Sequence, residues 1–172
     1  MKNSKTITVE ATVNAPVERV WEYWTSPEHI TRWNNASEDW HTPHAENDLR
    51  KGGRFLSRME ARDGSVGFDF GGVYDQVKEN ELIEYTIDDG RKVRIEFSDD
   101  GDHATVTETF DPETTHPLEM QQGGWQAILD SFKKYTEAKK NASFKKLHFS
   151  IGILAPKEKV WQTMLEDKTY RE

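Results

Sequence analysis

The stretch that decides the fold is residues 13–24, VNAPVERVWEYW, which joins the end of a strand to the start of a helix. Before it, residues 6–13 alternate apolar and polar side chains, the period of a half-buried strand. Pro16 stands where a first helical turn tolerates proline, and Glu18 places a carboxylate in that turn. The apolar residues that follow have helical spacing and predict one buried helix face. They are Val17, Val20, Trp21 and Trp24.

The same opening recurs in altered form at residues 153–164, ILAPKEKVWQTM. Each matching residue lies 140 positions after its counterpart, and a strand-like stretch precedes both copies. The second copy stops at Glu172, whereas the first continues into the rest of a domain. We therefore expect a complete domain over residues 1–140. Residues 141–172 would form a linker and the truncated strand-helix opening of a second copy.

This truncated copy would carry an apolar helix face with no sheet of its own to cover. An exposed apolar face favours association. We expect it to dock onto the first domain or to form a homodimer through residues 147–172. The alternative is that the sequence ends there in a disordered tail.

The composition limits the classes of partner. The chain has 172 residues, of which 34% are hydrophobic, and this is enough for one domain with a substantial core. A net charge of −8 disfavours binding to nucleic acid or to an anionic membrane surface. There is no apolar run long enough to span a bilayer and no signal-like segment in residues 1–5, so we expect a cytoplasmic protein. The absence of cysteine excludes disulfides and a thiolate nucleophile.

The middle of the chain has the pattern of an antiparallel sheet. A second short helix is expected over residues 28–33, followed by a polar, irregular segment over 34–51. Alternating stretches separated by turn signals then predict five strands joined by hairpins. They span residues 55–61, 66–77, 82–87, 93–97 and 105–110. A long amphipathic helix over residues 117–140 completes an α+β fold, in which the sheet curves around this helix.

Several motifs in this order resemble those of the START-like (SRPBCC) superfamily, which has the helix-grip fold. Within it, the chain is similar to the bacterial group related to the C-terminal domain of the activator of Hsp90 ATPase (AHSA1-like). The resemblance covers residues 6–138 and is carried by the motif at 15–21, Trp33, Trp40-His41-x-Pro43, Gly52-Gly53-x-Phe55, Gly71-Gly72-Val73-Tyr74 and Gly124-Trp125 with Leu129 and Phe132. It implies a deep apolar pocket between sheet and long helix, used by different members for lipids, polyketides or other hydrophobic molecules. It does not imply one reaction, since many members bind, some are cyclases and the chaperone-related branch binds a protein.

The candidate ligand-binding residues are mainly aromatic side chains that share strand or helix faces. Together they would line a pocket of ordinary ligand size. The alternative is that they pack on one another as a core, as most buried aromatic residues do. The candidates are Trp24, Trp33, Trp40, Phe55, Met59, Phe68, Phe70, Tyr74, Tyr85, Val93, Ile95, Phe97, Glu108, Trp125, Leu129 and Phe132.

Glu108 is the sharpest single candidate. It shares strand parity with Val106 and Phe110, so it should face the same way as two apolar side chains. A carboxyl group in an apolar pocket would have a raised pKa, and would act as an acid or base or hold a ligand's polar group. The alternatives are a salt bridge to Arg58 or Arg94, or a strand whose polar face is reversed.

Other polar clusters have simpler explanations. His41 and His44 flank Pro43 in a predicted loop, where no helix aligns their imidazoles, so we expect a polar loop and no metal site. The basic residues around Gly52-Gly53 lack the Gly-Lys-Ser/Thr of a phosphate loop and fit a solvated turn. The six histidines are scattered and give no Ser-His-Asp arrangement. We expect no cofactor, and Glu108 is the one weak catalytic candidate.

Three functions remain open. The first is non-catalytic binding of a small hydrophobic ligand between the sheet and the long helix. The second is a protein-interaction module akin to the Hsp90 activator, which predicts a filled cavity and an exposed binding surface. The third is an enzyme of the cyclase or isomerase kind with Glu108 as base, which the weak acid-base inventory ranks last.

Overall fold

A computed structural model describes the backbone of residues 5–152 and the side chains of residues 5–139. The chain divides into two units, residues 1–136 and residues 137–172, and the account below concerns the first. No helix in the described part of the chain is both long enough and apolar enough to cross a membrane.

The first unit is built on one seven-stranded sheet in the order β1-β7-β6-β5-β4-β3-β2, and all six pairings are antiparallel. The hairpins follow the predicted turns. The first strand, β1, pairs with the last strand, β7, and forms one edge of the sheet. The strands are β1 (Ile7–Val13), β2 (Trp40–Asn47), β3 (Arg54–Ala61), β4 (Gly67–Lys78), β5 (Leu82–Ile87), β6 (Lys92–Asp99) and β7 (Ala104–Phe110). The helices are α1 (Val17–Thr25), α2 (Pro27–Trp33) and α3 (Leu118–Gly152).

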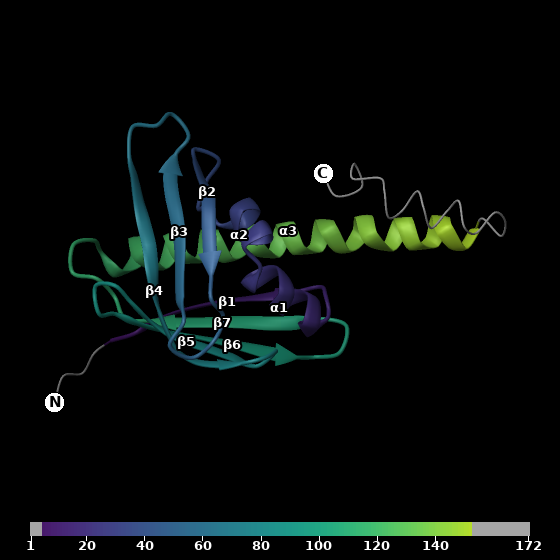
Figure 1. Cartoon of the computed structure of the whole chain (residues 1–172), viewed down its shortest axis with the longest axis horizontal. Coiled ribbons are helices and arrows are strands. Elements are labelled where there is room, and N and C mark those ends of the chain that lie inside the picture. Colours follow the sequence, from purple (N-terminus) through teal and green to yellow (C-terminus); the bar gives the residue numbers. More distant parts are fainter. Residues whose placement is uncertain (1–4, 153–172) are drawn as a thin grey trace. The chain divides into compact units, whose positions relative to one another are not determined.

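The sheet twists strongly, so that β2, β3 and β4 run across the direction of β1, β7 and β6 (Figure 1). Irregular pairing contributes, with register shifts between His41 and His44 and between Tyr74 and Gln76. Gly72 on β4 allows a close approach of neighbouring backbone, because a Cβ there would lie 2.3 Å from the carbonyl oxygen of Thr86. This curvature gives the sheet a concave face that the helices can cover.

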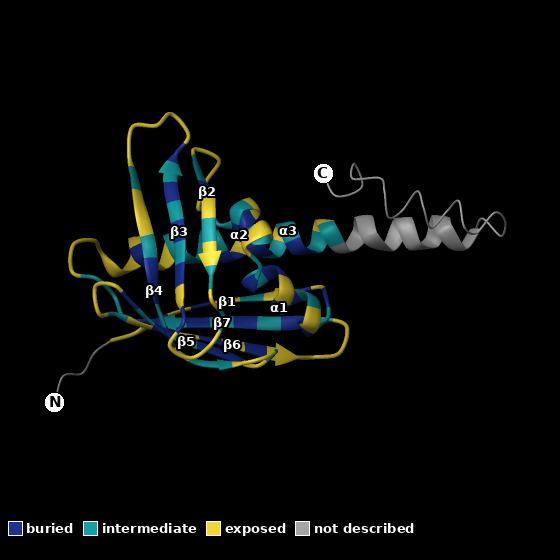
Figure 2. Cartoon of the chain, viewed as in Figure 1, coloured by how far each residue is buried: buried dark blue, intermediate teal, exposed yellow. Residues whose placement is uncertain are grey.

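The core lies between this concave face and the helices (Figure 2). On β7 every second residue is buried, which is the alternation that the sequence predicts. Rings from all three helices meet there: Trp24 stacks on Trp33 with centroids 4.9 Å apart, and Phe132 stands edge-on to both. Aromatic pairs of this kind add about 0.5–1.5 kcal/mol each beyond the area that they bury. They fix α1 and α2 against the first part of α3.

The predicted α+β helix-grip fold is confirmed, with one strand missed. We expected residues 34–51 to be irregular, and this was wrong, because Trp40–Asn47 forms β2. This strand is at the edge of the sheet and pairs only with β3, so it has few buried residues and a weak alternation.

The helix α3 extends further than predicted. Its backbone stays helical to Gly152, through residues where we expected a linker and the start of a strand. Residues 153–172, which hold most of the proposed second copy, lie outside the described residues. The division into a domain and a truncated copy, and the homodimer through residues 147–172, therefore stay predictions.

Candidate functional site

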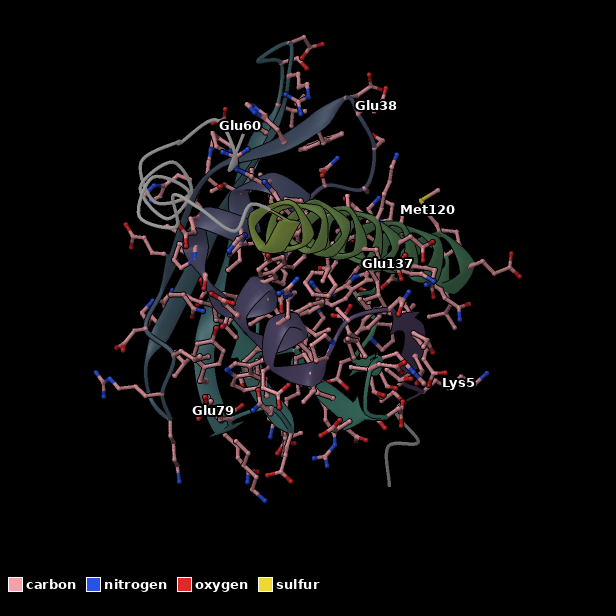
Figure 3. All side chains as sticks on the ribbon, turned by 90° about the vertical axis from the view of Figure 1, so that its right-hand side faces the viewer. Lys5, Glu38, Glu60, Glu79, Met120 and Glu137 are labelled. Carbon is pink, nitrogen blue, oxygen red and sulfur yellow. The ribbon has the colours of Figure 1, made fainter. Side chains whose placement is uncertain are left out.

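A cavity of about 470 Å³ lies in the first unit, between the concave face of the sheet and the helices. In the view along α3, side chains crowd this interior, whereas Lys5 and Glu79 point away from it (Figure 3). Most of the predicted ligand-binding residues line the cavity. They are Trp24, Trp33, Phe55, Met59, Phe68, Phe70, Tyr74, Tyr85, Glu108 and Trp125.

The remaining candidates lie away from the lining, and their contact with a ligand stays a prediction. Val93, Ile95 and Phe97 are buried on β6, where the ring of Phe97 packs on Trp21 of α1 at 5.1 Å. Leu129 and Phe132 are fully buried in the core. Trp40 lies at the start of β2 with its ring 6.0 Å from that of Phe68. A period of two identifies the face of a strand, but it does not identify which part of that face a helix covers.

Other residues of the lining escaped the sequence analysis. Ser57 and Ile83 share strand parity with predicted candidates, so the same rule would have found them. Asn47 belongs to the missed edge strand β2. Arg91 and His116 come from turns and loops, where periodicity gives no signal.

Tyr74 and Asn47 form a polar bridge on one wall of the cavity. The Tyr74 hydroxyl donates a hydrogen bond to Asn47 Oδ1 at 2.5 Å, and Asn47 Nδ2 donates to the carbonyl oxygen of Thr25 at 2.6 Å. Burial raises the pKa of Tyr74, although the hydrogen bond to Asn47 opposes it. The bridge connects β4, through β2, to the end of α1, and burial keeps the Tyr74 hydroxyl protonated.

Glu108 is buried in the cavity wall with an exposed fraction of 4%. It lies on β7 between Val9 of β1 and Ile95 of β6, so apolar residues flank it on both neighbouring strands. Within the described part of the chain, its carboxyl group has neither a hydrogen-bond nor an ion-pair partner. Burial alone raises its pKa from 4.5 to about 8. The carboxyl group is therefore mainly protonated at pH 7 when the cavity is empty.

The expected salt-bridge alternatives for Glu108 are wrong. Arg58 pairs with Glu60 at 2.9 Å and also with Asp69, on the outer side of the sheet. Arg94 pairs with Glu84 at 3.0 Å and with Glu96 at 2.6 Å. The parity argument for the buried side of β7 is confirmed, because Val106, Glu108 and Phe110 are all buried.

Tyr85 is the titratable neighbour of Glu108. Burial raises the pKa of Tyr85 well above its usual value, and the nearby Glu108 carboxylate raises it further. The ring of Tyr85 stands edge-on to Phe55, with centroids 4.6 Å apart. Both Tyr85 and Glu108 thus bring polar groups into a largely aromatic space.

The loop before α3 contributes Glu113 and His116 to the cavity lining. Gln121 holds it by accepting the Glu113 N–H at 2.9 Å and donating to the His116 carbonyl oxygen at 2.8 Å. Burial would raise the pKa of Glu113, but backbone hydrogen bonds from Thr115 and His116 and the His116 side chain outweigh it and lower the pKa to about 2. His116 Nδ1 lies 2.9 Å from Glu113 Oε1. Within the lining, Glu113 and His116 therefore form a pair.

The polar clusters set aside as metal or phosphate sites lie outside these interactions. His44 pairs with Glu46 at 2.9 Å, and His41 lies 3.8 Å from Glu60. Across the described residues, no group of three or more histidine or acidic side chains is placed to hold a metal ion. At the start of β3, Arg54 pairs with Asp88 at 3.1 Å. The absence of a cofactor stays a prediction.

Comparison with known proteins gives the family. Residues 14–137 match the family model described as "Activator of Hsp90 ATPase homolog 1-like protein". The chain belongs to this family. This AHSA1-like domain therefore accounts for the whole sheet after β1 and for the cavity. Among curated proteins, none matches the chain.

Two solved structures are similar in both sequence and fold. A solution structure of an AHSA1-like protein from Aeromonas hydrophila is 46% identical, with a TM-score of 0.74, and the match covers 78% of this chain and 93% of that one. A solution structure of Chr148 from Cytophaga hutchinsonii is 61% identical, with a TM-score of 0.68, and the match covers 79% and 94%. A crystal structure of NE0264 from Nitrosomonas europaea, 19% identical with a TM-score of 0.69 over 82% and 99% of the two chains, shows the fold alone.

Proposed function

We propose that this AHSA1-like protein binds a small hydrophobic ligand in the cavity between the sheet and α3, without transforming it. One observation carries the proposal: a space of about 470 Å³ is lined mainly by apolar side chains, eight of them aromatic. Ligand pockets commonly have volumes of about 300–1,000 Å³, whereas ordinary protein interiors hold few voids larger than a water molecule. A core built for stability alone would have filled this space.

The geometry supports this function over a protein-interaction module. A module that acts only through its surface is expected to have a packed interior, and an open aromatic cavity would cost it stability. The few polar groups in the wall, such as Glu108, Tyr85 and Tyr74, are the kind that orient a ligand.

A second candidate, an enzyme with Glu108 as general base, is favoured by a specific observation. A carboxyl group with a pKa of about 8 would be poised for proton transfer near neutral pH. Glu108→Gln separates the two functions, since it would retain ligand but lose any turnover if Glu108 is the base. Turnover that survives in this variant would remove Glu108 from the mechanism.

Native mass spectrometry of the purified protein, followed by denaturation and extraction, tests the binding function. We expect a defined hydrophobic molecule to accompany the protein or to be taken up from a panel of lipids and aromatic compounds. A clean unliganded mass, with no uptake from the panel, would contradict the proposal and favour the protein-interaction module.

Two neighbouring glycines at the start of α3 provide a matched control. Gly124 lines the cavity, whereas Gly123 is exposed and outside the lining, and a Cβ at either position meets no atom within 4 Å. Gly124→Leu should fill part of the cavity and weaken uptake about tenfold or more, whereas Gly123→Leu should leave it unchanged. Equal uptake by both variants would place the ligand elsewhere on the protein.

A further inference from the structure

Most charged groups of the cavity lining have a partner, and Glu108 is the exception among the described residues. The lining includes three carboxyl groups, those of Glu46, Glu108 and Glu113, against one arginine and one histidine. Arg91 pairs with Asp89 at 2.8 Å and Glu46 pairs with His44 at 2.9 Å, both partners lying outside the lining, and His116 pairs with Glu113 at 2.9 Å. The cations are therefore already matched, while the Glu108 carboxyl inside has no partner among the described residues. The whole chain, at a net charge of −8, also attracts cations.

An unpartnered carboxyl group in an aromatic wall selects among ligand charges. An anionic ligand would lose hydration at the apolar wall and would be repelled by the Glu108 carboxylate, and both effects disfavour it. A neutral ligand would gain one hydrogen bond from Glu108. A cation would form a charge-assisted hydrogen bond with the Glu108 carboxylate, and the faces of rings such as Tyr85, Phe55 and Trp125 would attract it as well.

We propose that the cavity takes a hydrophobic cation, a protonated amine on an aromatic or alicyclic body, whose ammonium group pairs with Glu108. This ligand class rests on the proposed binding function. The apolar body would occupy the aromatic space, and the ammonium group would lie at β7. No covalent step is involved.

Pairing with an ammonium group would release a proton from Glu108. The carboxyl group is mainly protonated at pH 7 in the unliganded protein, because burial raises its pKa to about 8. In the complex it would be ionised, so binding at pH 7 should release up to one proton. The other titratable groups of the cavity lining come from strands and loops, since the helices contribute only neutral residues to the lining. These groups are Tyr85 of β5, which interacts with Glu108, Tyr74 of β4, Glu46 of β2, Arg91 of the turn before β6, and Glu113 and His116 of the loop before α3.

Isothermal titration calorimetry of the full chain tests this proposal. The probes are phenethylamine, tryptamine and naphthylethylamine, each compared with its alcohol and with the corresponding arylacetate. Titrations in buffers of different ionisation enthalpy measure the protons released. We expect the best-fitting amine to bind about tenfold or more tightly than its alcohol, and the arylacetate to bind most weakly. The affinity of the amine should rise about tenfold per pH unit between pH 6 and pH 8 and then level off.

The variant Glu108→Gln isolates the carboxyl group. It should lower amine affinity to that of the alcohol and abolish both proton release and the pH dependence. Glu96→Gln makes the same substitution on the exposed side of β6 and should leave amine affinity, proton release and pH dependence unchanged. Circular dichroism and urea unfolding would show that both variants fold.

The outcomes separate this proposal from the binding function. If alcohols bind as tightly as amines and Glu108→Gln changes nothing, the cation proposal is overturned, while the hydrophobic cavity remains a binding site. If the arylacetates bind best, the charge assignment is reversed and the proposal fails. If none of the probes binds, and native mass spectrometry shows no ligand, both are overturned.

Discussion

Replacing Glu108 with glutamine should change how the stability of the protein depends on pH. Burial raises the pKa of Glu108 from 4.5 to about 8 in the folded state, and the side chain is only 4% exposed. Between these two pH values the folded protein keeps the proton, whereas the unfolded chain has released it. Unfolding therefore releases a proton, and stability falls as the pH rises from 4.5 through 8. The stability that protonated Glu108 contributes to the folded protein is fully present below pH 4.5 and is lost above pH 8.

The expected size follows from the shift in pKa. Each pH unit inside this window changes the free energy of unfolding by about 1.4 kcal/mol per proton. Relative to Glu108→Gln, which cannot ionise, the wild-type protein should lose about 3 kcal/mol of stability between pH 5 and pH 8. Such a difference is a large share of the stability of an ordinary domain.

Urea unfolding followed by tryptophan fluorescence measures this difference at pH 5, 6, 7 and 8. The difference between the two proteins isolates Glu108 from other titrating groups, and Glu96→Gln controls for a glutamate-to-glutamine change at an exposed site. A difference that stays constant to within about 0.5 kcal/mol across the range would refute the burial argument. It would mean that water or a protein group solvates the carboxyl group in the folded state.

Three further predictions concern the fold and the loop before α3. Phe132→Ala removes a fully buried ring and should lower the free energy of unfolding by about 3–5 kcal/mol, and a loss below about 1 kcal/mol in urea would contradict the packing. Gly72→Ala should lower the Tm, because its Cβ would lie 2.3 Å from a carbonyl oxygen, whereas Gly123→Ala in an open helix position should raise the Tm. Equal Tm values for the two variants would contradict this. Hydrogen bonds lower the pKa of Glu113 to about 2, despite the opposing effect of burial, so the wild type should lose stability relative to Glu113→Gln between pH 4.5 and pH 2 in acid titrations.

The parts of the fold that the sequence predicts are those with two buried neighbours. The residues of β7 alternate cleanly because β1 and β6 flank the strand and the core covers one face. The opposite case is β2, which pairs with β3 alone and carries polar residues on most positions. An edge strand of this kind is held by backbone hydrogen bonds, and side-chain periodicity carries little of that information.

The same limit applies to the cavity. Parity identifies the faces of Phe55, Tyr85 and Phe97, but only the position of α1 decides that Phe97 packs on Trp21 while the other two line the cavity. For Glu108, parity predicts the buried side of the strand. It does not predict the missing partner, because Arg58 and Arg94 find carboxylates on the outer side of the sheet. The cross-strand pairs Arg58–Asp69 and Arg94–Glu84 depend on the register of neighbouring strands.

The stability and binding experiments use the same residue but test different properties of it. A buried carboxyl group without a partner weakens the empty protein as the pH rises, so a core selected for stability alone would favour an apolar residue at position 108. A residue that costs stability in the empty protein and gains a partner in the complex is typical of a binding site. If Glu108→Gln abolishes the pH dependence of stability but leaves amine binding and proton release unchanged, Glu108 is buried as described, yet the ligand's charged group lies elsewhere in the cavity. The ligand class would then have to be inferred from Arg91, Glu113 and His116 at the rim.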